Sequence, residues 1–272
     1  MFLLFALGVA ASLLVGSMLL MEYGRRLGAE QVARTGNPVT GLGAVESAVF
    51  ALMGLLLAFA ISGGLQRFDE RRQLLVQEAN AVSSAYGLAD LLQDGAKDRI
   101  RSELKSYLEA RIALFELPVG YSILDGQEIY SHEQQAKIDQ HRHQVWEDAV
   151  TSCRETPNTV ACVLLLPALN RVFEAARLRS GVNERHPPTI VHIMLFGLGL
   201  GGSLLAGFGM GASGSRSWLH LLTFASALAV TLYVITDLEF PRVGIIVVGD
   251  FDHFLKDVLA DMNRGQPAAP PN

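Results

Sequence analysis

Charged residues are scarce in this sequence: they make up 18% of its 272 residues, whereas hydrophobic residues make up 50%. A soluble domain of this length usually carries nearer a quarter charged residues. The net charge is −5, which gives no indication of a nucleic-acid partner. No G-x-S-x-G, H-E-x-x-H, P-loop or C-x-x-C motif is present. We therefore expect no enzymatic activity, no metal site, no cofactor and no nucleic-acid partner.

Long apolar runs are the main feature that is present. Four segments of about 20 residues lie at 1–21, 44–65, 189–209 and 217–236. At about 1.5 Å rise per residue, each is long enough to cross the ~30 Å hydrocarbon core of a bilayer. The alternative is a set of buried core helices, which such long runs with so few charges disfavour. The first run has no basic region before it and no A-x-A-like site after it, so we interpret it as a retained anchor.

A polar stretch of about 120 residues separates the second and third runs, and its apolar residues recur at helical spacing. We expect helices at 67–92, 96–117, 132–154 and 159–180, and a loop at 118–131. The second run continues into the first of these helices without a turn, and Gly63-Gly64 at the junction marks a place for a bend. Between the first two runs, 22–43 contains a Gly36-Asn37-Pro38 turn motif.

The predicted fold is an all-α integral membrane protein with four transmembrane helices and a helical extramembrane domain inserted between helices 2 and 3. The boundaries are 1–65 (transmembrane helices 1 and 2), 66–187 (a helical, cytoplasmic domain), 188–236 (transmembrane helices 3 and 4) and 237–272 (a C-terminal tail, disordered from about 264).

Arginines near the membrane ends predict which side is cytoplasmic. Seven lie on the side of the termini and the 66–187 domain, against four on the other side, and cytoplasmic flanks carry the excess of Lys and Arg. The two cysteines leave two alternatives open. Cys153 and Cys162 flank a predicted turn and could form a disulfide, which would favour an oxidising compartment. They could equally be two small buried residues of a helical hairpin.

Four residues of the second span are candidates for a pore. Phe50, Leu57 and Ile61 lie on one face and could form a hydrophobic constriction, or could face lipid. Glu46 lies at the start of the span, where an acid near hydrocarbon is costly and is a functional candidate. Its other role would be that of an acid favoured by the helix N-terminus.

A charge cluster follows the same span. We hypothesise that Asp237, at the end of the fourth span, pairs with an arginine of the 67–72 cluster and ties spans two and four at the interface. The alternative is interfacial anchoring with solvated charge pairs along the helix. The residues of this predicted interfacial network are Arg67, Asp69, Arg71, Arg72, Glu78, Asp237 and Arg242.

Three strings carry a family resemblance: 67-RFDERRQLLVQEANAVSSAY-86, 169-LNRVFEAARLR-179 before 186-HPP-188, and 237-DLEFPRVGIIVV-248. They resemble the bacterial bestrophin-like membrane family, and the likeness is weakest in 22–43 and 118–160. By analogy with true bestrophins, it implies a four-span subunit of a pentameric anion channel, with both termini in the cytosol and the second span lining a hydrophobic neck. No acidic cluster resembles the animal calcium clasp, so calcium gating is not implied.

Two functions follow from these observations. The first is a homo-oligomeric anion channel of the bacterial cytoplasmic membrane, with its pore lined by the second span. The second is a non-conducting membrane scaffold or sensor whose helical domain binds a protein partner. A membrane-bound enzyme would be a third class, but no motif supports it.

Overall fold

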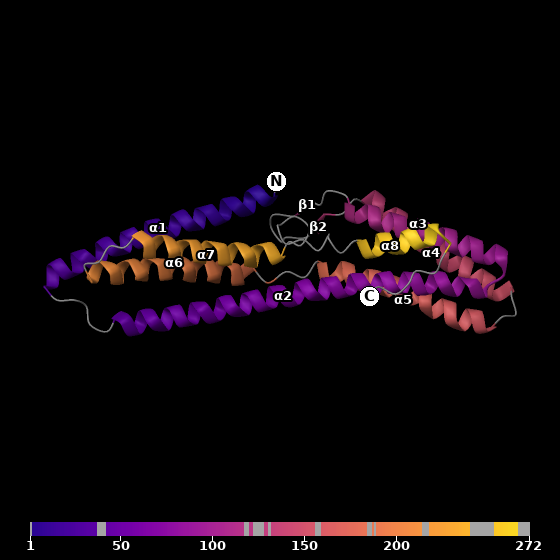
Figure 1. Ribbon diagram of the computed structural model, residues 1–272, viewed down its shortest axis with the longest axis horizontal. Helices are drawn as coiled ribbons and strands as arrows, with labels where there is room; N and C mark the ends of the chain where they lie inside the picture. The colour runs from indigo at the N-terminus through magenta and orange to yellow at the C-terminus, as the bar shows by residue number, and fades with distance from the viewer. Residues whose placement is uncertain are drawn as a thin grey trace. The chain divides into compact units, whose positions relative to one another are not determined.

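Almost all residues that the structure describes lie in α-helices, which confirms the predicted all-α class (Figure 1). This computed structural model describes residues 2–36, 42–116, 120–121, 128–129, 132–155, 159–183, 187, 189–213, 218–239 and 253–265. The chain divides into two compact units. Unit 1 comprises Met1–Phe68 and Pro187–Val247, and unit 2 comprises Asp69–His186 and Val248–Asn272.

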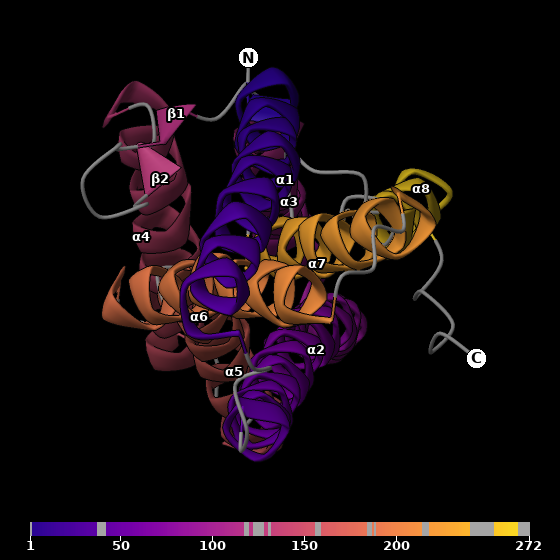
Figure 2. The same ribbon diagram turned by 90° about the vertical axis from the view of Figure 1, so that its left-hand side faces the viewer.

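Unit 1 contains the four helices that are long and apolar enough to cross a membrane, as predicted. They are α1 (Phe2–Thr35), the first part of α2 (Leu42–Leu88), α6 (Thr189–Ala212) and α7 (Trp218–Glu239). Within this unit, α6 and α7 lie between α1 and the first part of α2 in both ribbon views (Figures 1 and 2). The protein is thus a multi-pass membrane protein with four spans.

Helix α1 is longer than the predicted apolar run 1–21, because it continues to Thr35. Residues 22–35 contain no proline, and Glu22 forms charge pairs one turn away with Arg25 (2.7 Å) and Arg26 (3.3 Å). Such pairs stabilise a helix that leaves the apolar region. The helix ends where Gly36 adopts φ +68° and its N–H donates to the Val32 carbonyl at 2.9 Å. The predicted turn therefore begins at Gly36, whereas Asn37 and Pro38 lie outside the described residues.

Helices α1 and α6 are in direct backbone contact within unit 1. A Cβ added at Gly207 would lie 2.0 Å from the Met21 carbonyl oxygen, and one at Gly24 would lie 2.1 Å from the Leu204 carbonyl oxygen. Gly28 and Gly211 make equivalent contacts one turn further on. Only glycine permits this approach, which is the small-xxx-small packing expected where lipid, not water, surrounds the helices.

Unit 2 is a helical bundle around an apolar core. It contains the second part of α2, the short 3₁₀ helix η1 (Ala89–Leu91), α3 (Asp94–Glu116), α4 (His132–Glu155), α5 (Thr159–Asn183) and α8 (His253–Asn263). Two short strands, β1 (Gly120–Tyr121) and β2 (Glu128–Ile129), pair antiparallel where the sequence analysis placed only a loop. Fully buried members of the core include Leu75, Val82, Ile100, Leu104, Leu108, Leu165 and Leu169.

Helix α8 was not predicted, because the sequence analysis treated the chain after 237 as a tail. Its buried residues are Leu255, Val258 and Met262, which recur at helical spacing and join the core of unit 2. The Tyr86 hydroxyl donates to the Met262 carbonyl at 3.1 Å. The disorder predicted from about 264 concerns residues that lie, beyond Gly265, outside the described part of the chain.

Helix α2 runs as one helix from Leu42 to Leu88, which confirms that no turn separates the second span from the polar stretch. At the predicted bend, Gly64 is buried and packs on α7: a Cβ there would lie 3.3 Å from Leu238 Cδ1. This close contact gives the glycine a packing role.

Candidate functional site

The predicted constriction residues lie on the face of α2 that packs against the other spans. Phe50, Leu57 and Ile61 are half-buried and contact the core of unit 1. The Phe50 ring meets the Phe224 ring edge to face, with centroids 5.7 Å apart, and covers Gly202 of α6. These contacts give the three residues a packing role inside one chain, and their part in a pore stays a prediction.

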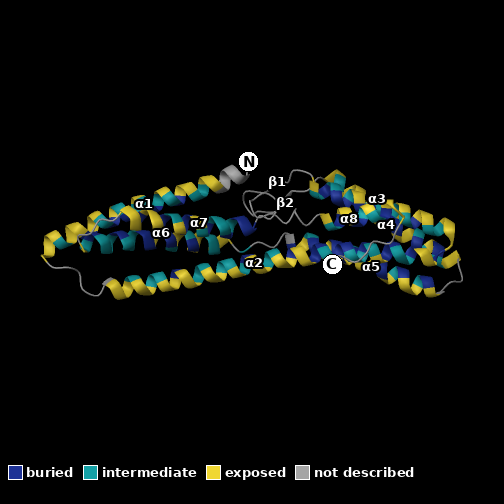
Figure 3. Cartoon of the chain, in the orientation of Figure 1, coloured by how far each residue is buried: buried dark blue, intermediate teal, exposed yellow. Residues whose placement is uncertain are grey.

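The opposite side of α2 is open. Val45, Leu52, Leu55 and Phe59 are 58%, 50%, 53% and 66% exposed, and the coloured cartoon shows how little of this part of α2 is buried (Figure 3). In the most apolar window of each span, 11% of residues are buried in α2, against 22–33% in α1, α6 and α7. Helix α2 therefore offers more free surface to lipid, or to another subunit, than any other span.

Glu46 lies near the N-terminal end of α2 and faces α6. Its Oε1 atom is buried and has no hydrogen-bond partner among the described residues. The carboxylate occupies the space beside Gly209, where a Cβ would lie 2.6 Å from Oε1. A buried polar atom without a partner costs free energy, so Glu46 keeps its place as a candidate functional residue.

At the other end of the first part of α2, an ion pair joins α2 to α7. The Nε atom of Arg67 donates to both carboxylate oxygens of Glu239, at 3.1 and 3.2 Å, and its Nη2 atom also donates to Oε1. The Glu239 side chain is buried and that of Arg67 is about one quarter exposed. This pair ties spans two and four through Glu239, a residue outside the predicted network.

The pairing predicted for Asp237 stays a prediction. Asp237 is fully buried, and its Oδ1 accepts a hydrogen bond from the Tyr233 hydroxyl at 3.2 Å. Among the other predicted network residues, Arg71 is buried while Asp69 and Arg72 are exposed. Arg242 lies outside the described residues. Glu239 could have been found from sequence, because it lies two positions after Asp237 in the same exit segment.

Glu78 takes part in a buried charge network inside unit 2. Its Oε1 accepts a hydrogen bond from Arg111 Nε of α3 at 2.8 Å, and its Oε2 accepts one from Arg179 Nη1 of α5 at 3.0 Å. Burial raises the pKa of the Glu78 carboxyl, but the two guanidinium groups outweigh it and hold the pKa below its usual value. The Phe115 ring lies 3.7 Å from Arg179 Cζ and 5.2 Å from Arg111 Cζ. This network joins α2, α3 and α5.

An open groove lies on unit 2 between α2 and α5, with a volume of about 820 Å³. Gln77, Asn80 and Ser84 line its α2 side, and Val163 and Leu164 belong to its α5 side. Both sides mix apolar and polar residues: the α2 side also includes Leu88, and the α5 side also includes Arg171 and Glu174.

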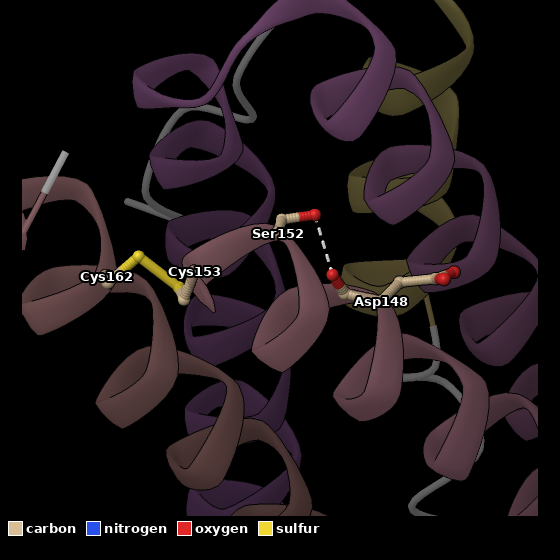
Figure 4. The surroundings of a disulfide bond; sticks show 4 residues. All are labelled: Asp148, Ser152, Cys153 and Cys162. Carbon is tan, nitrogen blue, oxygen red and sulfur yellow. Dashed lines mark hydrogen bonds between the residues drawn. A yellow bond between two sulfur atoms is a disulfide. The ribbon is translucent and has the colours of Figure 1, made fainter. Parts of the chain in front are cut away.

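Cys153 and Cys162 form a disulfide between the end of α4 and the start of α5 (Figure 4). Their Cα atoms are 5.6 Å apart and nine positions separate them in sequence. Beside it, the Ser152 hydroxyl donates to the Asp148 carbonyl at 2.7 Å (Figure 4). Of the two alternatives that the sequence left open, the structure shows the bonded one.

Two histidines of α4 lie beside carboxylates. His141 Nδ1 lies 3.0 Å from Glu103 Oε2, and His143 Nε2 lies 3.0 Å from Glu147 Oε1. Nowhere in the described part of the chain do three or more His, Cys, Asp or Glu side chains form a group that could hold a metal ion.

Comparisons with known proteins place this geometry in a family context. The bestrophin-like domain matches residues 10–250. A single-substitution variant of a bacterial bestrophin homologue from Klebsiella pneumoniae is similar in structure, with a TM-score of 0.69, 14% identity, and coverage of 93% of this chain and 98% of that one. A second variant from the same organism gives a TM-score of 0.69 at 15% identity, with 94% and 98% coverage. No curated protein matches the sequence.

Proposed function

We propose that this chain, which belongs to the bestrophin-like family, is the subunit of a homo-oligomeric ion channel with a pore lined by α2. The observation that carries the proposal is the exposed side of α2 in unit 1, the least buried of the four spans. In a ring of subunits, this exposed side of each α2 would face the central axis and enclose a lumen. By analogy with the true bestrophins, the permeant ion is an anion and the ring is a pentamer.

The lining is proposed to come from Leu52, Leu55 and Phe59. They recur at helical spacing on one exposed side of α2 and are large enough to form a constriction that gates by dewetting. The sequence-based lining by Phe50, Leu57 and Ile61 is the competing version. It requires residues that already pack against α6 and α7 to turn toward a lumen.

The proposed location is the bacterial cytoplasmic membrane, with the termini and unit 2 in the cytosol. Support comes from the excess of arginines near the membrane ends on that side. Helix α2 then carries the pore lining in its first part and the buried Glu78 network in its second part.

Flux through liposomes tests the channel. In a parent that carries Cys153→Ser and Cys162→Ser, single cysteines are placed at Leu52, Leu55 or Phe59, with Phe50→Cys and Leu57→Cys as matched controls from the packed face. We expect anion efflux from the parent, and we expect a negatively charged thiol reagent to block it in the first set alone. If the reagent blocked efflux only in the Phe50→Cys and Leu57→Cys variants, the pore would instead be lined by Phe50, Leu57 and Ile61.

The channel proposal fails if a well-folded oligomer of the parent shows no flux of anions or cations. The second function would then be favoured, namely a non-conducting scaffold or sensor that binds a protein partner. The groove of about 820 Å³ between α2 and α5 is the observation in its favour.

A further inference from the structure

Cys153 and Cys162 are the two cysteines of the chain, and they meet where two helices of unit 2 join. Cys153 lies in the last turn of α4 and Cys162 in the first turn of α5. Both residues are half-buried, so small reagents in water can reach them. No other thiol of the chain competes for either partner.

Two observations point to different compartments for unit 2. The arginine distribution favours the cytosol, where cellular thiol systems keep cysteines reduced. The disulfide belongs to an oxidising environment. The arginine distribution and the disulfide are compatible if the bond forms and breaks reversibly in the cytosol. Cytosolic disulfides are usually transient and serve catalysis or redox sensing. The inference below rests on the cytosolic placement of unit 2 proposed above.

We propose that Cys153 and Cys162 form a reversible redox site that exchanges with a low-molecular-weight thiol–disulfide couple of the glutathione class. In the oxidising direction, a protein thiolate attacks the small disulfide, forming a mixed disulfide and releasing one small thiolate. The second protein thiol loses its proton and attacks the mixed disulfide, releasing the other. Two electrons thus pass from the protein to the small disulfide, and two protons accompany the two small thiols.

The positions of the two residues assign their roles. Thiolates are favoured at helix N-termini, and Cys162 lies in the first turn of α5. Cys153 lies at the opposite kind of terminus, the C-terminal turn of α4. Cys162 is therefore the attacking thiol, and Cys153 is the resolving thiol that closes the bond.

The bond controls the start of α5. Within α5, Pro167 has no N–H to donate to the preceding turn, so the helix is weakened between 159–166 and the remainder. The disulfide fixes this first part to α4 from the other end. Val163 and Leu164 lie in it and line the groove, whereas Ala161 and Leu165 anchor its other side in the core. Reduction therefore loosens the part of the groove's α5 wall that Val163 and Leu164 form.

The first test is a redox titration of the folded protein in detergent, using defined ratios of reduced and oxidised glutathione. Free thiols are counted by maleimide mass tags after acid quenching. We expect complete and reversible conversion without denaturant. Cys153→Ser should trap a mixed disulfide with glutathione at Cys162, and the matched Cys162→Ser variant should trap much less. A bond that resists reduction in the folded protein, or that never forms, would overturn the proposal.

The second test is hydrogen exchange of the two redox states, with α3 as the internal control. Reduction should speed amide exchange in 159–166 by about tenfold, because the disulfide no longer restrains local opening of this segment. The double variant Cys153→Ser/Cys162→Ser should match the reduced protein under all conditions. Equal exchange in both states would show that the bond does not control this segment.

The third test traps thiols in growing cells, before and after a pulse of a thiol oxidant, and a reporter fused after the C-terminus reports its side of the membrane. We expect reduced thiols before the pulse and a disulfide after it. A permanently bonded pair would overturn the redox site, and a periplasmic reporter would overturn the proposed orientation. Neither result tests ion conduction, which the liposome flux assay measures separately.

Discussion

The helices of the two units pack against one another through different kinds of residue. In unit 1, α1 and α6 meet through glycines whose backbones touch, and Arg67 and Glu239 join α2 to α7. In unit 2, helices bury large aliphatic side chains and a charged network centred on Glu78. In lipid, the hydrophobic effect does not drive helices to associate. Close backbone packing and polar contacts between helices stabilise the association instead. Water drives apolar side chains together, so unit 2 is held by its core.

The largest expected effect comes from the charge network of unit 2. Glu78→Gln leaves the guanidinium groups of Arg111 and Arg179 buried without their carboxylate, and should cost about 3–5 kcal/mol of stability. Thermal unfolding of the purified protein measures it. Glu133→Gln removes an exposed pair with Lys137 and should leave unfolding unchanged. Equal behaviour of the two variants would mean that the core, and not the network, decides the stability of unit 2.

The pH dependence of the same variant sharpens the test. The pKa of Glu78 is lower in the folded protein than its reference value of 4.5, so its contribution is fully present above that value and is lost as pH falls through the folded pKa. The gap in unfolding temperature between wild type and Glu78→Gln should stay constant at pH values above 4.5, narrow as the pH falls below 4.5, and close as the pH passes through the lower pKa of the folded state. A gap that opens on acidification would contradict the assigned sign.

The glycine contacts of unit 1 come next in size. Gly207→Ala places a Cβ against the Met21 carbonyl and should cost about 2–3 kcal/mol as α1 and α6 are forced apart. Gly201→Ala is the matched control on the same helix, because open space surrounds that position in the described chain. Yield and monodispersity in detergent, with unfolding temperature, provide the measurement. Similar losses for both variants would show that the backbone contact is not what holds unit 1.

The ion pair of unit 1 gives the smallest expected effect and decides between two carboxylates. Glu239→Gln removes the charge that faces Arg67 and should cost about 1–2 kcal/mol. Asp237→Asn should cost less if Tyr233 is its main partner, since an amide oxygen can still accept that hydrogen bond. The reverse order in unfolding temperature would support the pairing of Asp237 that the sequence analysis proposed.

Helix periodicity made most elements of unit 2 readable, but not the position of each charge. The helix expected at 96–117 is α3 (Asp94–Glu116), and the one at 132–154 is α4 (His132–Glu155). The pairing of Arg111 with Glu78 could not be predicted from the sequence, because the two residues are 33 positions apart and meet only in the folded unit. Helix α8 was readable in principle from Leu255, Val258 and Met262, but its short length gave a weak pattern.

The sequence alone determined that this chain has four helices able to cross a membrane and a helical insert between the second and third, because the length of an apolar run and the spacing of apolar residues are local properties of a sequence. Three features needed the tertiary structure: which face of α2 is covered, which carboxylate meets Arg67, and whether Cys153 meets Cys162. Each depends on how two helices rotate and slide against one another, whether they are distant in sequence or, like α4 and α5, consecutive along the chain. A rotation of one residue, about 100° around a helix, exchanges a packed side chain for an exposed one, and no local pattern fixes that angle.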